Sequence, residues 1–166
     1  MNEDRVPHEL IYHLKMGQAF RPVEKIVNLV PFEKIGFRPE PFPYSFYELF
    51  WHIRFTQLDI LNYCIHSSYE PPVWPGDYWP GKTGPNHEKE WEALKKSYFT
   101  ERDQLADLIR TSEYGLDDRV AGQSENSDEI HTIFREVLLV IEHSAYHTGQ
   151  LVMMGRMLGV YPRRDA

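Results

Sequence analysis

The sequence predicts an all-α fold, a four-helix bundle with a long crossover loop between its second and third helices. Four segments carry apolar residues mostly three or four positions apart, the spacing of an amphipathic helix. No segment shows the sustained apolar–polar alternation of a half-buried strand. Residues 67–85, between the second and third patterns, are too rich in proline to be regular, and we expect short first and third connections. A chain of 166 residues fits one domain, residues 1–166, with a single core.

The first helical pattern runs from about Glu9 to Val30. Pro22 lies inside it. A proline ring removes a backbone donor and clashes with the carbonyl group four residues earlier. We therefore expect this helix to be kinked or split in two.

The second helix has the clearest start. Ser45 and Glu48 have the spacing of a capping box, in which the serine accepts from the third helical amide and the glutamate reaches back. This predicts a helix from about residue 46 to 66. The crossover, residues 67–85, then contains five prolines and four large aromatic residues, and it is long enough to be a functional loop. Its aromatic residues Trp74, Tyr78 and Trp79 would either form a wall over a binding site or anchor the loop to the bundle.

The third helix is predicted from about residue 87 to 111, with Asn86 as its cap. For the last helix, Asn126 with Glu129 three residues later resembles a capping box. That helix should continue to about Leu158, where Gly159 and Pro162 end it. Its middle is apolar nearly all round, which is typical of the most buried helix of a bundle.

Composition excludes several classes of function. The 18 basic and 25 acidic residues give a formal charge of -7, and no cluster of Lys and Arg could neutralise a run of phosphates, so nucleic acid is a poor partner. Cys64 is the only cysteine, which excludes an internal disulfide, a thiolate zinc knuckle and a Cys-ligated iron-sulfur cluster built by one chain. Cys64 itself is expected to be a buried small hydrophobe. The first ten residues lack an apolar stretch, and the longest aliphatic run is residues 137–141. We expect a cytoplasmic protein with no membrane partner.

Two histidines on the last helix point to a metal. His143 and His147 are four residues apart, so at about 100° per residue their side chains lie about 40° apart on one face. The apolar residues of this helix share that face, so the imidazoles should point inward. A buried polar group without a partner costs roughly 1 to 3 kcal/mol. A helical pair at this spacing places two nitrogens on one ion.

A third ligand must come from another helix. His52 is the best candidate because it lies in an apolar run about two turns into the second helix. Glu48 and Asp59 share its face, and Glu136 lies close to the face of His147. These three carboxylates are candidates for a fourth ligand, for partners that orient an imidazole, and for the catalytic acid or base.

The set predicts one divalent ion with an open coordination position. Three neutral imidazoles accept Zn, Ni, Fe or Cu, and we expect Zn or Ni before Fe, Mn or Cu. Such an ion lowers the pKa of a bound water or thiol and polarises a substrate oxygen, which suits hydrolysis or thiol transfer. The spacings of a zinc-protease helix and of a di-iron carboxylate bundle are absent. The remaining alternative is a purely structural cluster of core histidines.

Two stretches resemble the metal-binding stretches of the DinB-like superfamily: SFYELFWHI at residues 45–53 and EHSAYHTGQL at residues 142–151. RMLG at 156–159 and YWP at 78–80 are also similar to its members. The resemblance implies a four-helix bundle with a divalent metal held by three histidines, here His52, His143 and His147. Relatives include bacillithiol transferases and mycothiol-dependent maleylpyruvate isomerase, which use a low-molecular-weight thiol. Homodimers are common among them, so we expect a homodimer.

The expected function is that of a metal-dependent enzyme, a transferase or a hydrolase. The ion would activate a thiol or water against a small electrophilic substrate admitted beneath the crossover. The alternative from another class is a non-catalytic module of a stress response that binds a metal or a small ligand without turnover.

Overall fold

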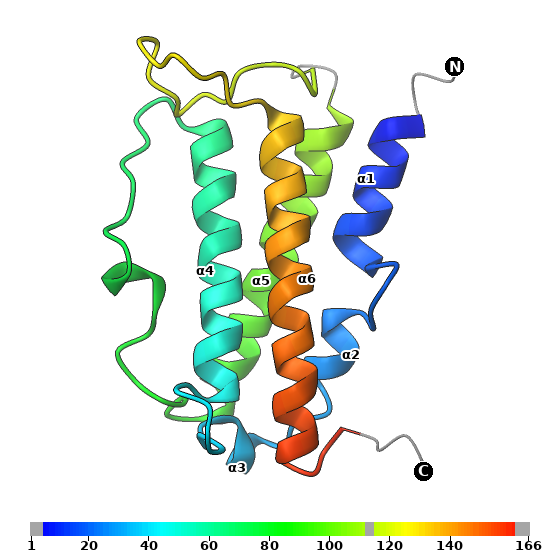
Figure 1. Cartoon of the computed structure of the whole chain (residues 1–166), viewed down its shortest axis with the longest axis vertical. Coiled ribbons are helices and arrows are strands. Elements are labelled where there is room, and N and C mark those ends of the chain that lie inside the picture. The colour runs from blue at the N-terminus through cyan, green and yellow to red at the C-terminus, as the bar shows by residue number, and fades with distance from the viewer. Residues whose placement is uncertain (1–4, 112–114, 162–166) are drawn as a thin grey trace.

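Four long helices lie side by side along one axis in the computed structural model, which describes residues 5–111 and 115–161 (Figure 1). Two short helices and one 3-10 turn complete the secondary structure of these ranges, and they contain no strand. The all-α four-helix bundle predicted from the sequence is therefore confirmed. The elements are α1 (Arg5–Met16), α2 (Val23–Val27), α3 (Phe32–Ile35), α4 (Phe46–Ile65), η1 (Gly76–Tyr78), α5 (Glu88–Arg110) and α6 (Ile133–Met157).

The directions of the helices explain the long crossover. Helices α4 and α5 both run upward in Figure 1, whereas α1 and α6 run downward. A helix of 20 residues is about 30 Å long, so the chain must return along the outside of α4 before α5 can begin. Residues 66–87 do this, with η1 about halfway (Figure 1). The predicted crossover between the second and third long helices is thus confirmed.

The other two connections are longer than predicted. Residues 17–45 join α1 to α4 and include α2 and α3, and residues 111–132 join α5 to α6 at one end of the bundle. The first helical pattern is split, as expected of Pro22, which precedes the first residue of α2. Helix α1 already ends at Met16, because Gly17 has a φ of 59°, the left-handed region that glycine tolerates.

Two predicted caps are wrong. The amide of Glu90 donates to Nδ1 of His87, so His87 caps α5 in place of Asn86. Helix α6 begins after Thr132, whose hydroxyl accepts from the amide of Arg135, and not after Asn126.

The late start of α6 has a backbone cause. The amides of Val120, Ile133 and Phe134 bond carbonyls across the two arms of the loop, and Arg119 and Thr132 form an isolated β-bridge. The amides of Ile133 and Phe134 are therefore bonded across the loop and not to the carbonyls of residues 129 and 130, as a helix that began earlier would require. At the other end Gly159, with a φ of 71°, ends α6 as predicted, and Pro162 lies outside the described residues.

The start of α4 is the predicted capping box. The hydroxyl of Ser45 accepts from the amide of Glu48 at 3.1 Å, and the Glu48 carboxylate accepts from the amide of Ser45 at 2.7 Å. This fixes the helical phase of α4 from its first turn. It thereby fixes the direction in which His52, less than two turns later, points into the bundle.

Two apolar clusters fill the bundle, one towards each end. The first includes Phe46, Phe50, Trp91, Tyr98 and Leu151, and the second includes Leu14, Leu61, Leu105, Ile133 and Val137. Between them lie buried polar residues from α4, α5 and α6, namely His52, Gln57, Glu101, Arg102, Ser144, His147 and Thr148. A polar layer therefore crosses the middle of an otherwise apolar interior.

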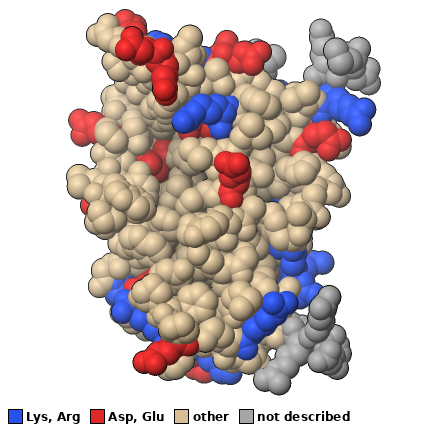
Figure 2. Space-filling model, viewed as in Figure 1, with Lys and Arg blue, Asp and Glu red and all other residues tan. Residues whose placement is uncertain are grey.

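The surface is unevenly charged on the face formed by α4 and α6. Charged side chains gather towards its two ends, and few lie across its middle (Figure 2). Several exposed apolar side chains come from α6, namely Leu138, Leu139, Tyr146, Met153 and Met157. Within the described residues, none of the helices has the length and hydropathy needed to cross a membrane.

Candidate metal centre

Three histidines from two helices converge in the polar layer. His52 comes from α4, and His143 and His147 come from successive turns of α6. Each offers a ring nitrogen, and these nitrogens all lie within 4.8 Å of one another. The Nε2 atoms of His52 and His143 are 3.1 Å apart, and the ring centroids are 4.4 to 5.0 Å apart. The structure thus brings together the three rings that the sequence singled out.

Hydrogen bonds on the far side of two rings fix which nitrogen faces the cluster. Nδ1 of His52 lies 2.9 Å from the carbonyl oxygen of Tyr78, and Nδ1 of His147 lies 2.6 Å from Oε1 of Gln150. Both oxygens only accept, so both Nδ1 atoms carry the proton and donate it. The Nε2 atoms of His52 and His147 are left with lone pairs.

The spacing of the His52 and His143 nitrogens fits a divalent cation. Two imidazole nitrogens bound at about 2.0 to 2.1 Å to one ion lie about 2.8 to 3.4 Å apart for angles between octahedral and tetrahedral. The 3.1 Å between His52 and His143 falls in this range. Two uncharged nitrogens whose lone pairs face each other repel unless a proton or a cation lies between them. An all-imidazole donor set suits Zn, Ni, Cu or Fe.

Burial keeps the three rings in the form that binds a metal. It lowers the pKa of His52 and of His147 below the usual value of 6.5. The pKa of His143 falls to about 3, because burial is reinforced by the neighbouring rings of His147 and His52. All three imidazoles are therefore neutral at pH 7, and a metal need not displace protons from them.

Aromatic rings line one side of the site. The Trp79 ring lies flat on His52, with centroids 4.4 Å apart and planes 6° apart, and Tyr44 stacks on Trp79. Tyr146 meets His147 edge-on and is 67% exposed, so it belongs to the rim of the site. Trp74 lies further out, where it is 67% exposed and packs against the ring of Tyr78. The crossover thus covers His52 with Trp79, while Trp74 is at the surface.

The three candidate acid–base carboxylates lie away from the rings. Among the described residues, the metal-capable group contains no carboxylate. Glu48 is held by Arg38 and Ser45, whose hydrogen bonds outweigh its burial and lower its pKa. Asp59 accepts from two tyrosines of the crossover, and buried Glu136 pairs with Arg135. A catalytic role for Glu48, Asp59 or Glu136 stays a prediction.

Asp59 and Glu136 instead line a cavity that is separate from the histidine cluster. It has a volume of about 500 Å³ and lies between the upper halves of α4 and α6, under the loop that precedes α6. Tyr63, Tyr69 and His131 contribute to its wall, and none of the three clustered histidines does. On both helices these carboxylates are seven residues, about 10 Å, from a clustered histidine.

Sequence reasoning missed two partners of the site. The carbonyl of Tyr78 has no signature in a sequence, because every residue carries one, and Tyr44 reaches the site only by stacking on Trp79. Gln150 lies three residues after His147 on the same helix, and it bonds the ring of His147. Gly149, between them in the sequence, does not serve a close approach of another helix, because an added Cβ would meet nothing within 4 Å.

Comparison with known proteins gives one match. A family model described as the DinB superfamily matches residues 17–151, most of the chain. No curated protein and no solved structure matches it. The matched range contains both histidine-bearing helical segments.

Proposed function

The chain belongs to the DinB superfamily, and from this premise we propose that it is an enzyme that depends on a divalent metal held by His52, His143 and His147. The observation that carries the proposal is the convergence of three neutral imidazoles, two of them with the proton fixed on the outer nitrogen. Donors of this kind favour Zn or Ni, with Fe, Mn or Cu as alternatives.

The proposed reaction is the transfer of a low-molecular-weight thiol to a small electrophilic substrate in the cytoplasm, with hydrolysis by water as the alternative. When bound, a divalent ion with an open coordination position would lower the pKa of the nucleophile it holds and would polarise the substrate. The protein's own groups prepare this site. Tyr78 and Gln150 hold two rings in one tautomer, and Trp79 shields His52 from water.

One observation favours a second candidate, a module that binds a metal or small ligand without turnover. A general acid or base must lie within hydrogen-bonding reach of the reacting group. The three candidate carboxylates are engaged elsewhere, with Arg38, Arg135 and the crossover tyrosines. Turnover would then require the metal-activated nucleophile alone.

Two measurements test the proposal. Elemental analysis of protein purified without an affinity tag should find one divalent ion per chain, and His147→Ala should lose it. Stoichiometric metal in that variant would contradict the assignment. A panel of thiols and electrophiles then separates the two candidates, because turnover that disappears in the histidine variants supports the enzyme, and metal without turnover supports the binding module.

A further inference from the structure

We propose that the hydrogen bond between Tyr78 and Asp59 positions the His52 imidazole for metal binding. Asp59 would thus be a positioning residue and neither a ligand nor the catalytic base. The inference rests on the proposed function, because it concerns the same ion. It assigns a role to two residues outside the three histidines, Tyr78 and Asp59.

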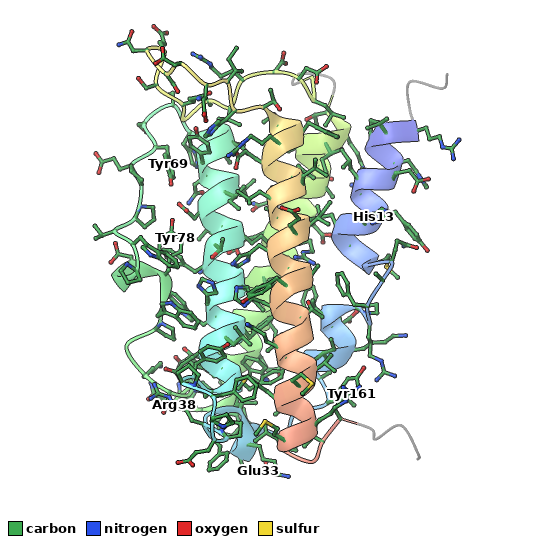
Figure 3. The ribbon with its side chains drawn as sticks, in the orientation of Figure 1. His13, Glu33, Arg38, Tyr69, Tyr78 and Tyr161 are labelled. Carbon is green, nitrogen blue, oxygen red and sulfur yellow. The ribbon has the colours of Figure 1, made fainter. Side chains whose placement is uncertain are left out.

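Asp59 ties the crossover to α4. It lies seven residues after His52, about 10 Å further along the helix, which is too far for both to bind one ion. Its Oδ1 accepts from the phenol of Tyr69 at 2.8 Å, and its Oδ2 accepts from the phenol of Tyr78 at 2.6 Å. Figure 3 shows these two tyrosines at different heights beside α4, on the side of the crossover. Each carboxylate oxygen therefore fixes one point of the crossover.

Tyr78 connects this carboxylate to the metal site through its two ends. Its phenol donates to Asp59, while its backbone carbonyl accepts from Nδ1 of His52 at 2.9 Å. The next residue, Trp79, lies flat on the same imidazole. The position of Tyr78 therefore sets both the acceptor that orients His52 and the ring that covers it.

The hydrogen bond is of a strong kind. A phenol that donates to an ionised carboxylate forms a bond roughly twice as strong as a neutral one. Burial and the Asp59 carboxylate raise the pKa of Tyr78 above its usual value, so the phenol keeps the proton that it donates. Rings of Phe55 and Trp74 also flank Tyr78, and these contacts do not need the hydroxyl. Removal of the hydroxyl alone should leave the ring packed but the carbonyl less firmly placed.

The consequence for His52 is a choice of tautomer. With the carbonyl in place, the proton stays on Nδ1 and the lone pair of Nε2 faces His143. With the carbonyl displaced, the proton can move to Nε2, and the ring can rotate away from His143. Loss of such an orienting partner typically lowers metal affinity about 10- to 100-fold.

Tyr69 provides a matched control within the same arrangement. It donates to the other oxygen of Asp59, but its backbone amide bonds the carbonyl of His66, far from the rings. Tyr69→Phe and Tyr78→Phe therefore remove the same group from the same carboxylate. Only Tyr78→Phe should disturb His52.

The experiment measures Zn affinity by competition with a chromophoric chelator for the wild type, Tyr78→Phe and Tyr69→Phe. A second readout is the ring-nitrogen NMR signal of His52 in the metal-free protein, which reports the tautomer directly. We expect about 10-fold weaker binding and a mixed tautomer for Tyr78→Phe, and wild-type behaviour for Tyr69→Phe. Asp59→Asn is measured alone and together with Tyr78→Phe. The double variant should bind Zn no more weakly than the weaker-binding of the two single variants, because both substitutions act through one hydrogen bond.

The outcomes separate this inference from the proposed function. Wild-type protein that binds no divalent ion would overturn both. Wild-type protein that binds Zn, with Tyr78→Phe equal to it in affinity and tautomer, would overturn the inference alone. Equal losses in Tyr78→Phe and Tyr69→Phe would also overturn it, since they would show a general loosening of the crossover. Thermal melting of the metal-free variants identifies any that fail to fold.

Discussion

Two polar clusters lie side by side in the middle of the bundle, and they differ in how their nitrogens are partnered. In the first, the buried Arg102 guanidinium donates to Gln57, to the carbonyl of Leu14 and to Ser144, at 2.8 to 2.9 Å. It also lies over the ring of Tyr98. In the second, His52 and His147 have protein partners on their outer nitrogens, while Nε2 of His143 and Nε2 of His52 face each other.

The contrast shows that the partners of a buried polar group, more than its burial, indicate whether it has a function. Both clusters draw on the same stretch of α6, where Ser144 faces Arg102 and its neighbours His143 and His147 face His52. Every nitrogen of Arg102 has an acceptor within the protein, which is how buried polar groups are ordinarily satisfied. The Nε2 atoms of His52 and His143 satisfy each other only if one of them carries a proton and donates it to the other. We call the first cluster complete because its guanidinium is paired without a ligand, although the buried hydroxyl of Tyr98 beside it has no partner among the described residues, and we call the histidine cluster incomplete.

The largest effect should come from the incomplete cluster. His143→Ala removes one of the two nitrogens that are 3.1 Å apart, and we expect metal affinity to fall at least about 100-fold. The melting temperature of the metal-free protein should change little, because His143 is half-buried and the polar contact that is lost is the one with Nε2 of His52. Isothermal titration and melting curves with and without Zn measure both quantities. His13→Ala is the control, since His13 is exposed on α1, away from the site (Figure 3). Comparable metal affinity in the two variants would contradict the contrast.

The complete cluster should respond in the opposite way. Arg102→Met leaves three acceptors without a donor, and we expect the free energy of unfolding to fall by about 2 to 4 kcal/mol. The loss is limited because the variant no longer buries a charge. It should be equal with and without metal, as measured by urea denaturation. Arg110→Met on the same helix is the control, because exposed Arg110 forms a surface ion pair with Asp107, and its loss should cost less than about 1 kcal/mol. A loss for Arg102→Met that appears only with metal would mean that the clusters are not independent.

The stability that the histidine cluster contributes to the metal-free protein should depend on pH. The pKa values of the clustered histidines are lowered by burial, that of His143 to about 3. An unfolded histidine takes up a proton near pH 6.5, so the unfolded state binds more protons below that pH and the stability of the metal-free protein falls. This contribution is complete above about pH 6.5 and is lost as the pH falls towards 3. Glu48, with its lowered pKa, adds a similar loss only below its usual value of 4.5. Burial raises the pKa of Glu101 above 4.5, so this carboxyl titrates between pH 6.5 and 4.5 with the opposite sign. The share of His143 is therefore the difference between the wild type and His143→Ala in urea denaturation over this window, and the variant should have the smaller rise of stability with pH. An unchanged slope would contradict the assignment.

The sequence predicted those features whose chemistry is local. Ser45 and Glu48 satisfy each other within one turn, and His143 and His147 share a face by spacing alone, so no knowledge of the rest of the chain was needed. Arg102 could not be recognised in this way. It reads as one charged residue among many on an amphipathic helix, and its partners come from α1, α4 and α6. The carbonyl of Tyr78 and the start of α6 at Thr132 also depend on contacts between distant segments.

The smallest expected effect concerns Gly149, which lies in the stretch that resembles the DinB-like superfamily but contacts neither cluster. An added Cβ would meet nothing within 4 Å, and the residue is exposed inside α6. Gly149→Ala should therefore raise the free energy of unfolding by about 0.5 to 1 kcal/mol, because alanine loses less conformational entropy in a helix than glycine. Zn affinity should stay at the wild-type value. Weaker binding at unchanged stability would show that a ligand or another chain approaches the backbone at Gly149. The incomplete cluster would then extend to the surface of α6.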